Sequence, residues 1–533
     1  MPDRRSCSHS EQGADTVSIT TEQLAGALRQ PGAYPHTVAE IGFQQTQMSL
    51  LFFVGDYVYK VKKPVNLGYL DYSTLETRKR LCEQEVTLNR RLCGDTYVGV
   101  VPVVQTPEGV RVESKGVPIE YAVKMRRLPA DRMLDGLLAR EKATGEMVES
   151  VARRVAKFHE EAETGEVIRT FGAIEAIKRN TDENFEQTLP RIGDTISQKN
   201  HDLIRNYTDA FLEDNRELFA RRVADGRIRD CHGDLHAAHV CMTEPICIYD
   251  CIEFNDRFRY GDVASEVAFL AMDLDRHGRR DLSRAFAGAY VEASNDSGAG
   301  QLMDFYKCYR AFVRGKVEGF KLGDALIPDA TKEAARQLAR RYFLLAKDYS
   351  TGQGTLVVMM GLAGSGKTSA AREVASLLSG RLLSSDIIRK QLAGVGPNEQ
   401  VYVPFGEAIY TKEWNERTYA AMVQSAEPVL TSGGCAILDA SFLREHQRQI
   451  AYELGRRTGA RMLLIECNAP EEVLRERLVR RVAEGAVSDG RLEILDGQLL
   501  VVEAIRQQDD VLHNVIQTNQ DRKRTLEDLW QIL

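Results

Sequence analysis

The segment that most constrains this chain is residues 355–368, TLVVMMGLAGSGKT, where a strand-like apolar run leads into a glycine-rich loop. The next residues, SAAREVASLL, have helical periodicity, so the order is strand, GxxxxGK(S/T) loop and helix, which is the P-loop pattern. Backbone N–H groups of such a loop, with the positive helix N-terminus, surround phosphate oxygens. The alternative is a plain glycine-rich turn. We predict a nucleoside triphosphate site formed by Gly361, Leu362, Ala363, Gly364, Ser365, Gly366, Lys367 and Thr368.

Three side chains of this region have predicted chemical roles. Lys367 is expected to reach the β- and γ-phosphates of ATP, and Thr368 is expected to hold Mg²⁺ through its hydroxyl. The apolar run Cys435–Leu438 ends in Asp439, as a Walker-B strand does. Asp439 is therefore a second candidate for the Mg²⁺ shell.

Composition limits the other functions of the chain. At 533 residues it is too long for one core, so two or three domains are expected. The net charge of -7 gives no electrostatic reason for nucleic acid as an obligate partner. No apolar run approaches the roughly 20 residues that span a bilayer. Ten cysteines without tight spacing indicate reduced thiols and a cytoplasmic protein.

The pattern along the chain divides it near residue 350. Residues 1–20 are predicted to be a disordered tail. Residues 21–349 begin with strands and a helix and continue mostly with helices, which indicates an α+β domain. The small polar segment 347–355, KDYSTGQGT, is interpreted as a linker. In residues 350–533 strands alternate with helices, which predicts an α/β domain with a parallel sheet.

Particular elements support this division. Upstream, strands are predicted at Phe52–Val61 and Ile119–Met125, and helices at Leu75–Leu92, Glu146–Glu161 and Thr331–Lys347. Downstream, strands are predicted at 355–360, 435–439 and 461–466.

The first domain has a chemical centre of its own. Residues 231–239, CHGDLHAAH, place Asp234 in a loop, and residues 246–250, ICIYD, place Asp250 at a strand end. Phosphoryl transfer needs such a pair, because one carboxylate accepts the substrate hydroxyl proton and the other holds Mg²⁺.

The pattern HGDLHxxx followed by IxD resembles the aminoglycoside phosphotransferase and choline-kinase branch of the protein-kinase-like fold, whose usual form is HGDLHxxN. The resemblance implies that Asp234 is the catalytic base and Asp250 the metal ligand. It also implies that Lys60 binds the ATP phosphates and that Glu85 pairs with this lysine. Lys62, on the same strand face, is the competing candidate.

One residue departs from that family. Its second metal ligand is an asparagine, and His239 stands at the matching position. Imidazole is a poor ligand for Mg²⁺ and a better one for a softer ion such as Mn²⁺. Three readings stay open: metal held mostly by Asp250, a preference for Mn²⁺, or a weakened kinase site.

A rival reading of the same window is a zinc site. It rests on Cys231, His232, His236, His239, Cys241, Cys247 and Cys251. The cysteines lack CxxC spacing, and His232 is interpreted as a structural residue that braces the loop.

The segment 250–262, DCIEFNDRFRYGD, is similar to a bacterial subfamily in which a kinase-like domain is fused to a P-loop kinase. Asp262 follows as the predicted start of a helix, where it can serve as an N-cap.

In the second domain, residues 382–390, LLSSDIIRK, place Asp386 and Arg389 at the C-terminal edge of the sheet, where ligands bind. This resembles kinases of the gluconate-kinase, chloramphenicol-phosphotransferase and zeta-toxin type. The resemblance implies that Asp386 takes the proton of the acceptor hydroxyl and that Arg389 grips the substrate. The alternative is an N-capping Asp386 beside a solvated Arg389.

A helix at 470–481 carries Arg477 and Arg481 at spacing i, i+4. Small P-loop kinases close such arginines over the γ-phosphate, so we predict catalytic roles for both. A solvated helix with Glu–Arg pairs is the alternative. Residues 484–491, EGAVSDGR, suit the mobile part of a lid.

These observations predict an ATP- and Mg²⁺-dependent phosphotransferase with two kinase-type domains, each acting on a hydroxyl of a small molecule. The alternative is a catalytically weak N-terminal binding module joined to a nucleotide switch. A further alternative is a C-terminal kinase that acts on nucleic-acid ends or nucleotide sugars. The sequence does not predict the acceptors or the oligomeric state.

Overall fold

The computed structural model describes residues 19–68, 70–325, 327–396, 408–483 and 492–533. They form two compact units. The first contains the residues up to 133 together with 232–234 and 239–259, and the second contains residues 134–231, 235–238 and 260–533. Within these described residues, no helix is long and apolar enough to cross a membrane.

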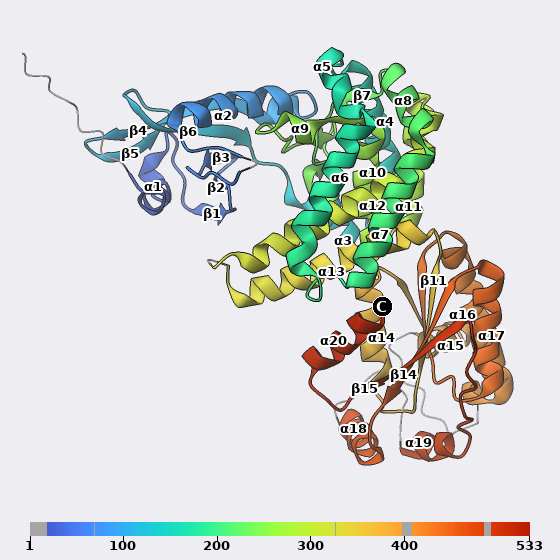
Figure 1. Ribbon diagram of the computed structural model, residues 1–533. Coiled ribbons are helices and arrows are strands. Elements are labelled where there is room, and N and C mark those ends of the chain that lie inside the picture. Colours follow the sequence, from blue (N-terminus) through green and yellow to red (C-terminus); the bar gives the residue numbers. More distant parts are fainter. Residues whose placement is uncertain (1–18, 69, 326, 397–407, 484–491) are drawn as a thin grey trace, which may run out of the picture. The chain divides into compact units, whose positions relative to one another are not determined.

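The first unit is built on a six-stranded antiparallel sheet with the order β1-β2-β3-β6-β4-β5 (Figure 1). Its strands are β1 (Ile41–Gln45), β2 (Ser49–Val54), β3 (Tyr57–Lys62), β4 (Tyr97–Thr106), β5 (Gly109–Val112) and β6 (Pro118–Arg126). Helix α2 (Leu75–Asn89) packs on β4 and β6, and α1 (Thr21–Leu28) packs near β5. The strand predicted at Phe52–Val61 is instead a hairpin, because the chain turns at Gly55, whose φ is 58°.

The same unit contains the segment that carries Asp250. A short hairpin of β8 (Val240–Cys241) and β9 (Cys247–Ile248) precedes it, and α9 (Asp256–Arg259) follows. Cys247 of β9 forms a disulfide with Cys93, just after α2, with 4.6 Å between the two Cα atoms. The expectation that all thiols are reduced is therefore wrong for this pair. Their sequence separation of 154 gave no indication that the two cysteines lie close together.

The second unit begins with a helical part. Its longest helices are α4 (Gly145–Glu161), α6 (Ile174–Thr188), α7 (Gln198–Asp214), α10 (Val263–Arg276), α11 (Arg280–Ser294), α12 (Ser297–Phe320) and α13 (Asp329–Thr351). Shorter elements are α3 (Leu134–Ala139), α5 (Glu166–Arg169), α8 (Arg216–Ala224), and the antiparallel pair β7 (Ile228–Asp230) and β10 (Tyr260–Asp262). Asp262 is the N-cap of α10, as predicted, and accepts a bond from the N–H of Ala264 (2.8 Å).

The rest of the second unit is a parallel five-stranded sheet with the order β12-β13-β11-β14-β15. Its strands are β11 (Thr355–Met360), β12 (Arg381–Ser384), β13 (Cys435–Asp439), β14 (Arg461–Asn468) and β15 (Val511–Gln517). One face packs against α16 (Lys412–Thr431) and α17 (Glu445–Thr458), and the other packs against α14 (Lys367–Leu377) and α20 (Arg522–Ile532) (Figure 1). The remaining helices are α15 (Ser385–Leu392), α18 (Glu471–Ala483) and α19 (Leu492–Leu499). The predicted parallel sheet is confirmed.

Helix α13 belongs to two cores. Phe343 and Leu345 pack with Phe312 of α12 in the helical core, whereas Leu344 packs with Val357 and Met359 of β11. The predicted linker at 347–355 is thus helical as far as Thr351, and only residues 352–354 separate α13 from β11. The helical part and the parallel sheet are therefore joined by a shared helix.

Candidate active sites

The P-loop lies between β11 and α14, and its backbone requires glycine. Gly361 and Gly364 have φ of 148° and 80°, a region that other residues rarely adopt. A Cβ at Gly361 would lie 2.6 Å from the carbonyl oxygen of Cys467, and one at Gly364 would lie 2.8 Å from that of Leu474. Lys367 Nζ donates to the carbonyl oxygen of Leu362 at 2.9 Å, so the lysine folds over the loop that it is predicted to serve.

The predicted metal ligands of this site lie together. Thr368 and Asp439 line one cavity, and the Thr368 hydroxyl favours the ionised form of the Asp439 carboxylate. Asp439 is buried at the end of β13, and burial raises its pKa against the opposing effect of Lys367. A hydroxyl and a carboxylate are the hard oxygen donors that Mg²⁺ prefers. Ser365 Oγ is buried without a hydrogen-bond partner among the described residues, which also fits a loop that awaits a polar ligand.

The predicted acceptor residues line the same cavity as the P-loop. This cavity has a volume of about 400 Å³ and its lining includes Lys367, Thr368, Asp386, Arg389 and Asp439. The acceptor side of its lining also contains Tyr410, Lys412, Asn415, Arg444, His446 and Gln447. No sequence motif indicated this second set, whose residues come from α16 and α17 and from the segments before them.

Asp386 is not the N-cap of α15, since that position is Ser384. Its carboxylate is half-exposed and lies 3.3 Å from a guanidinium nitrogen of Arg389. Arg389 is buried rather than solvated: it donates to Asn415 Oδ1 at 2.8 Å and stacks over the ring of Tyr410 at 4.8 Å. The capping alternative is therefore wrong, and both side chains are held at the cavity.

Arg477 contacts backbone that flanks the P-loop. Its guanidinium donates to the carbonyl oxygens of Gly364 (3.2 Å) and Thr518 (2.6 Å). Thr518 in turn donates to the carbonyl oxygen of Ser365 (2.8 Å), a contact that sequence reasoning missed. The side chain of Arg481 and residues 484–491 lie outside the described part of the chain, so the catalytic role of the two arginines stays a prediction.

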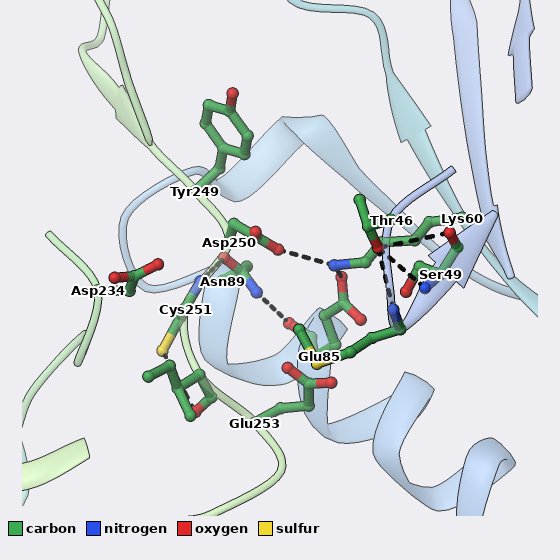
Figure 2. Close-up of polar contacts among 12 residues, drawn as sticks. Thr46, Ser49, Lys60, Glu85, Asn89, Asp234, Tyr249, Asp250, Cys251 and Glu253 are labelled. Carbon is green, nitrogen blue, oxygen red and sulfur yellow. Dashed lines mark hydrogen bonds and ion pairs between the residues drawn. The ribbon is translucent and has the colours of Figure 1, made fainter. Parts of the chain in front are cut away.

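In the first unit, Lys60, Glu85 and Asp250 come together from β3, α2 and the segment after β9 (Figure 2). Lys60 Nζ lies 2.7 Å from Asp250 Oδ1 and 2.9 Å from Glu85 Oε1. Burial alone would lower the pKa of Lys60, but Asp250 and Glu85 outweigh it and hold this pKa well above its usual value. Lys62 also reaches Glu85 but is fully buried, whereas Lys60 keeps contact with Asp250, so the geometry favours Lys60 as the phosphate lysine.

His239 lies between the two predicted catalytic carboxylates. Its Nδ1 donates to the backbone carbonyl oxygen of Asp234 at 2.9 Å and lies 3.5 Å from Asp234 Oδ2, while Nε2 lies 3.6 Å from Asp250 Oδ2. With the proton on Nδ1, Nε2 presents its lone pair toward Asp250. A nitrogen and a carboxylate oxygen so placed fit a divalent cation that accepts imidazole better than they fit Mg²⁺.

Asp250 itself has an uncommon backbone conformation. Its φ is 64°, in the left-handed region that non-glycine residues seldom adopt outside functional sites. Loss of solvation opposes its ionisation, but the ion pair with Lys60 outweighs this effect and holds its pKa well below the usual range. The carboxylate is thus kept ionised, as a metal ligand must be.

His232 has the bracing role that was predicted for it. It is buried, accepts from the N–H of Asp234 through Nδ1 (3.4 Å), and donates from Nε2 to the carbonyl oxygen of Tyr249 (3.0 Å). The disulfide removes Cys247 from the zinc reading, and Cys241 and Cys251 point their thiols at the backbone carbonyls of Pro129 and Ile252. These four residues therefore have other partners, whereas His236 and His239 each place a ring nitrogen within 4.8 Å of a carboxylate oxygen of Asp234.

Comparisons with known proteins agree with this geometry. Residues 78–306 match the phosphotransferase enzyme family (APH), and residues 356–505 match an AAA domain, AAA_33. The chain is 30% identical over 456 residues to an uncharacterized protein of Mycobacterium tuberculosis strain H37Rv, covering 85% of this chain and 88% of that protein. An uncharacterized protein of Mycobacterium bovis matches equally well. This chain belongs to the family of these proteins, and it is itself a phosphotransferase with an APH domain followed by a P-loop kinase domain.

Two solved structures are among those with some similarity to this chain. A choline/ethanolamine kinase family protein from Mesorhizobium loti is 12% identical, covers 62% of this chain and 98% of its own, and has a TM-score of 0.37. A gluconokinase from Sinorhizobium meliloti is 19% identical, covers 34% of this chain and 91% of its own, and has a TM-score of 0.25.

Proposed function

We propose that this phosphotransferase uses ATP at both sites and transfers the γ-phosphate to hydroxyl groups of small molecules. The observation that carries the proposal is the C-terminal cavity, because one space of about 400 Å³ is lined by the P-loop, by Asp439 and by Asp386 with Arg389. A nucleotide switch has no need of a carboxylate and an arginine opposite its phosphates. A kinase needs both.

In that cavity each side chain has a separate task. Asp386 accepts the proton of the acceptor hydroxyl, and Arg389, rigidly held by Asn415 and Tyr410, orients the acceptor. Lys367 turns from the carbonyl of Leu362 to the phosphates. Mg²⁺, held by Thr368 and Asp439, would supply charge neutralisation for the transferred group.

At the N-terminal site, Asp234 is the proposed base, Asp250 and His239 are the proposed metal ligands, and Lys60 is the proposed phosphate ligand. Nε2 of His239 faces the carboxylate of Asp250. Because imidazole binds Mn²⁺ better than Mg²⁺, this arrangement supports a preference for Mn²⁺ at this site. The same substitution of asparagine by histidine supports the second candidate, a binding module with weak catalysis. Nucleotide sugars and nucleic-acid ends are the alternative acceptors of the C-terminal site, since they present the same hydroxyl chemistry.

A metabolite-library screen with ATP consumption as readout tests the proposal. It should use the full chain, because the core around β11 includes Leu344 of the preceding helix and separate halves would break it. Lys367→Ala and Asp250→Asn variants, screened in parallel, assign each hit to one site. Acceptor-dependent ATP consumption that survives the combination of both substitutions would contradict the proposal.

A further inference from the structure

A row of alternating charges runs from the N-terminal site into the interior of the first unit. Asp250, at the open end, pairs with Lys60, and Lys60 pairs with Glu85 (Figure 2). Glu85 Oε2 also lies 2.6 Å from Lys62 Nζ, and Lys62 makes a further, short ion pair with Glu253. The inner three side chains are almost completely buried, so this second lysine is not a surface charge.

The two ends of this row belong to one short segment. Asp250 and Glu253 are three residues apart after β9, whereas Lys60 and Lys62 are two residues apart on one face of β3. Two carboxylates of this segment thus form ion pairs with two lysines of one strand, and Glu85 of α2 forms ion pairs with both lysines. The position of Asp250 relative to Lys60 is therefore tied to the inner pair of Lys62 with Glu253.

Hydrogen bonds reinforce the inner pair. The Tyr72 hydroxyl donates to the same oxygen of Glu253 that contacts Lys62, and Lys62 Nζ also reaches the Tyr72 hydroxyl at 3.2 Å. The N–H of Cys251 donates to Asn89 Oδ1 at 2.9 Å, and Asn89 donates back to the carbonyl oxygen of Glu85 at 2.8 Å. The three donors of Lys62 Nζ thus have acceptors, and one carboxylate oxygen of Glu253 accepts two hydrogen bonds, as buried charges require.

Lys62 keeps the buried charge of Glu85 balanced when Lys60 binds a nucleotide. When Lys60 turns toward phosphate oxygens, it shares its charge between them and Glu85, whose side chain is 0% exposed. A buried carboxylate that loses its partner is costly. Lys62 stays bonded to Glu85 and balances this charge whether or not Lys60 is engaged.

We propose that Lys62 and Glu253 are positioning residues of the N-terminal site. They anchor the segment that carries Asp250, and Lys62 balances the charge of Glu85. Lys60 can then leave its ion pair with Asp250 to bind the nucleotide phosphates, and Asp250 becomes available to bind the metal. This inference rests on the proposed nucleotide-binding function of that site.

The test measures binding and stability in one set of full-length variants. A Lys367→Ala background silences the P-loop site, and titration with a fluorescent ATP analogue in the presence of Mn²⁺ then reports the N-terminal site. The variants are Glu253→Gln, which keeps the shape and a hydrogen-bonding oxygen, and the charge-balanced pair Lys62→Met with Glu253→Gln. A matched control is Lys124→Met with Glu113→Gln, which removes an ion pair of 2.7 Å elsewhere in the same unit.

We expect the metal-dependent affinity to fall at least 10-fold in Glu253→Gln and in the charge-balanced variant, while the control keeps the parental affinity. Thermal unfolding of the charge-balanced variant should occur close to the parental midpoint, because one positive and one negative charge are removed together and Glu85 keeps its ion pair with Lys60. The loss of affinity would then be separate from any loss of stability.

Two results would overturn the inference, and they differ from each other. Parental affinity in Glu253→Gln and in the charge-balanced variant would show that the inner pair has only a structural role. No nucleotide binding in the Lys367→Ala parent, before Lys62 or Glu253 is changed, would remove the proposed function of the site and this inference with it. As a reference for lost metal binding, Asp250→Asn in the same background should abolish the Mn²⁺ dependence.

Discussion

Replacing Leu344 by alanine tests whether α13 is part of the P-loop domain. Leu344 is 2% exposed and packs with Val357 and Met359 of the strand that leads into the P-loop, although it lies before the boundary that composition suggests. Truncation of a buried leucine to alanine costs about 2–5 kcal/mol, and full burial between a helix and a sheet places this site near the middle of that range, at about 3 kcal/mol. In the P-loop domain, predicted at residues 350–533, the loss corresponds to a fall of roughly 6–12 °C in the unfolding midpoint.

The chain offers a convenient assay for this change. Both of its tryptophans, Trp414 and Trp530, lie in the P-loop domain, and Trp530 belongs to the same core as Leu344. Intrinsic fluorescence during thermal unfolding therefore reports on this domain. Leu345→Ala is the matched control, because the next residue along the helix packs in the helical core.

We expect Leu344→Ala to lower the midpoint of the fluorescence transition by more than Leu345→Ala does. The helical signal in circular dichroism should respond to both substitutions. The smallest response expected here is a shift of ~2 °C in the unfolding midpoint for each kcal/mol of lost stability. A fluorescence midpoint of Leu344→Ala within 1 °C of the parental value would therefore refute the shared core.

Three further predictions concern the sites. Lys367→Ala should abolish ATP turnover by the C-terminal site while circular dichroism stays unchanged, because the lysine supplies charge and not packing; unchanged turnover in an N-terminally inactivated background would contradict the P-loop role. Asp386→Asn should keep ATP affinity near the parental value and slow phosphoryl transfer by roughly 10²–10⁴, so a normal transfer rate would remove it as the base. His239→Asn should raise Mg²⁺-supported nucleotide binding or turnover and weaken the preference for Mn²⁺, as titrations with each metal would reveal. Zinc that is retained stoichiometrically by the parent and lost in His239→Asn would instead revive a metal cluster.

Local sequence patterns were sufficient for the elements that carry their own signal. The P-loop is recognisable because its glycines occupy backbone conformations that other residues avoid. The strand before it is buried throughout and almost entirely apolar because both sheet faces are covered. The helix predicted at Leu75–Leu92 is observed at Leu75–Asn89 for the same kind of reason: Thr74 caps it and its buried residues recur with helical spacing. The roles of Asp234 and Asp250, which rest on the chemistry that phosphoryl transfer demands, stay a prediction.

Other features depended on contacts between residues far apart in the chain, and the tertiary structure alone decided them. Periodicity could not assign Leu344 and Leu345 to different cores, because both positions are simply apolar in a helix. It could not rank Lys60 against Lys62, since both lie on one strand face and only the partners, Asp250 for one and Glu253 for the other, separate their roles. The burial of Arg389 and the disulfide between Cys93 and Cys247 likewise depend on contacts between residues far apart in the chain. A sequence records which groups can form an ion pair, a core or a bond, but the chain must fold before their distances select among the partners.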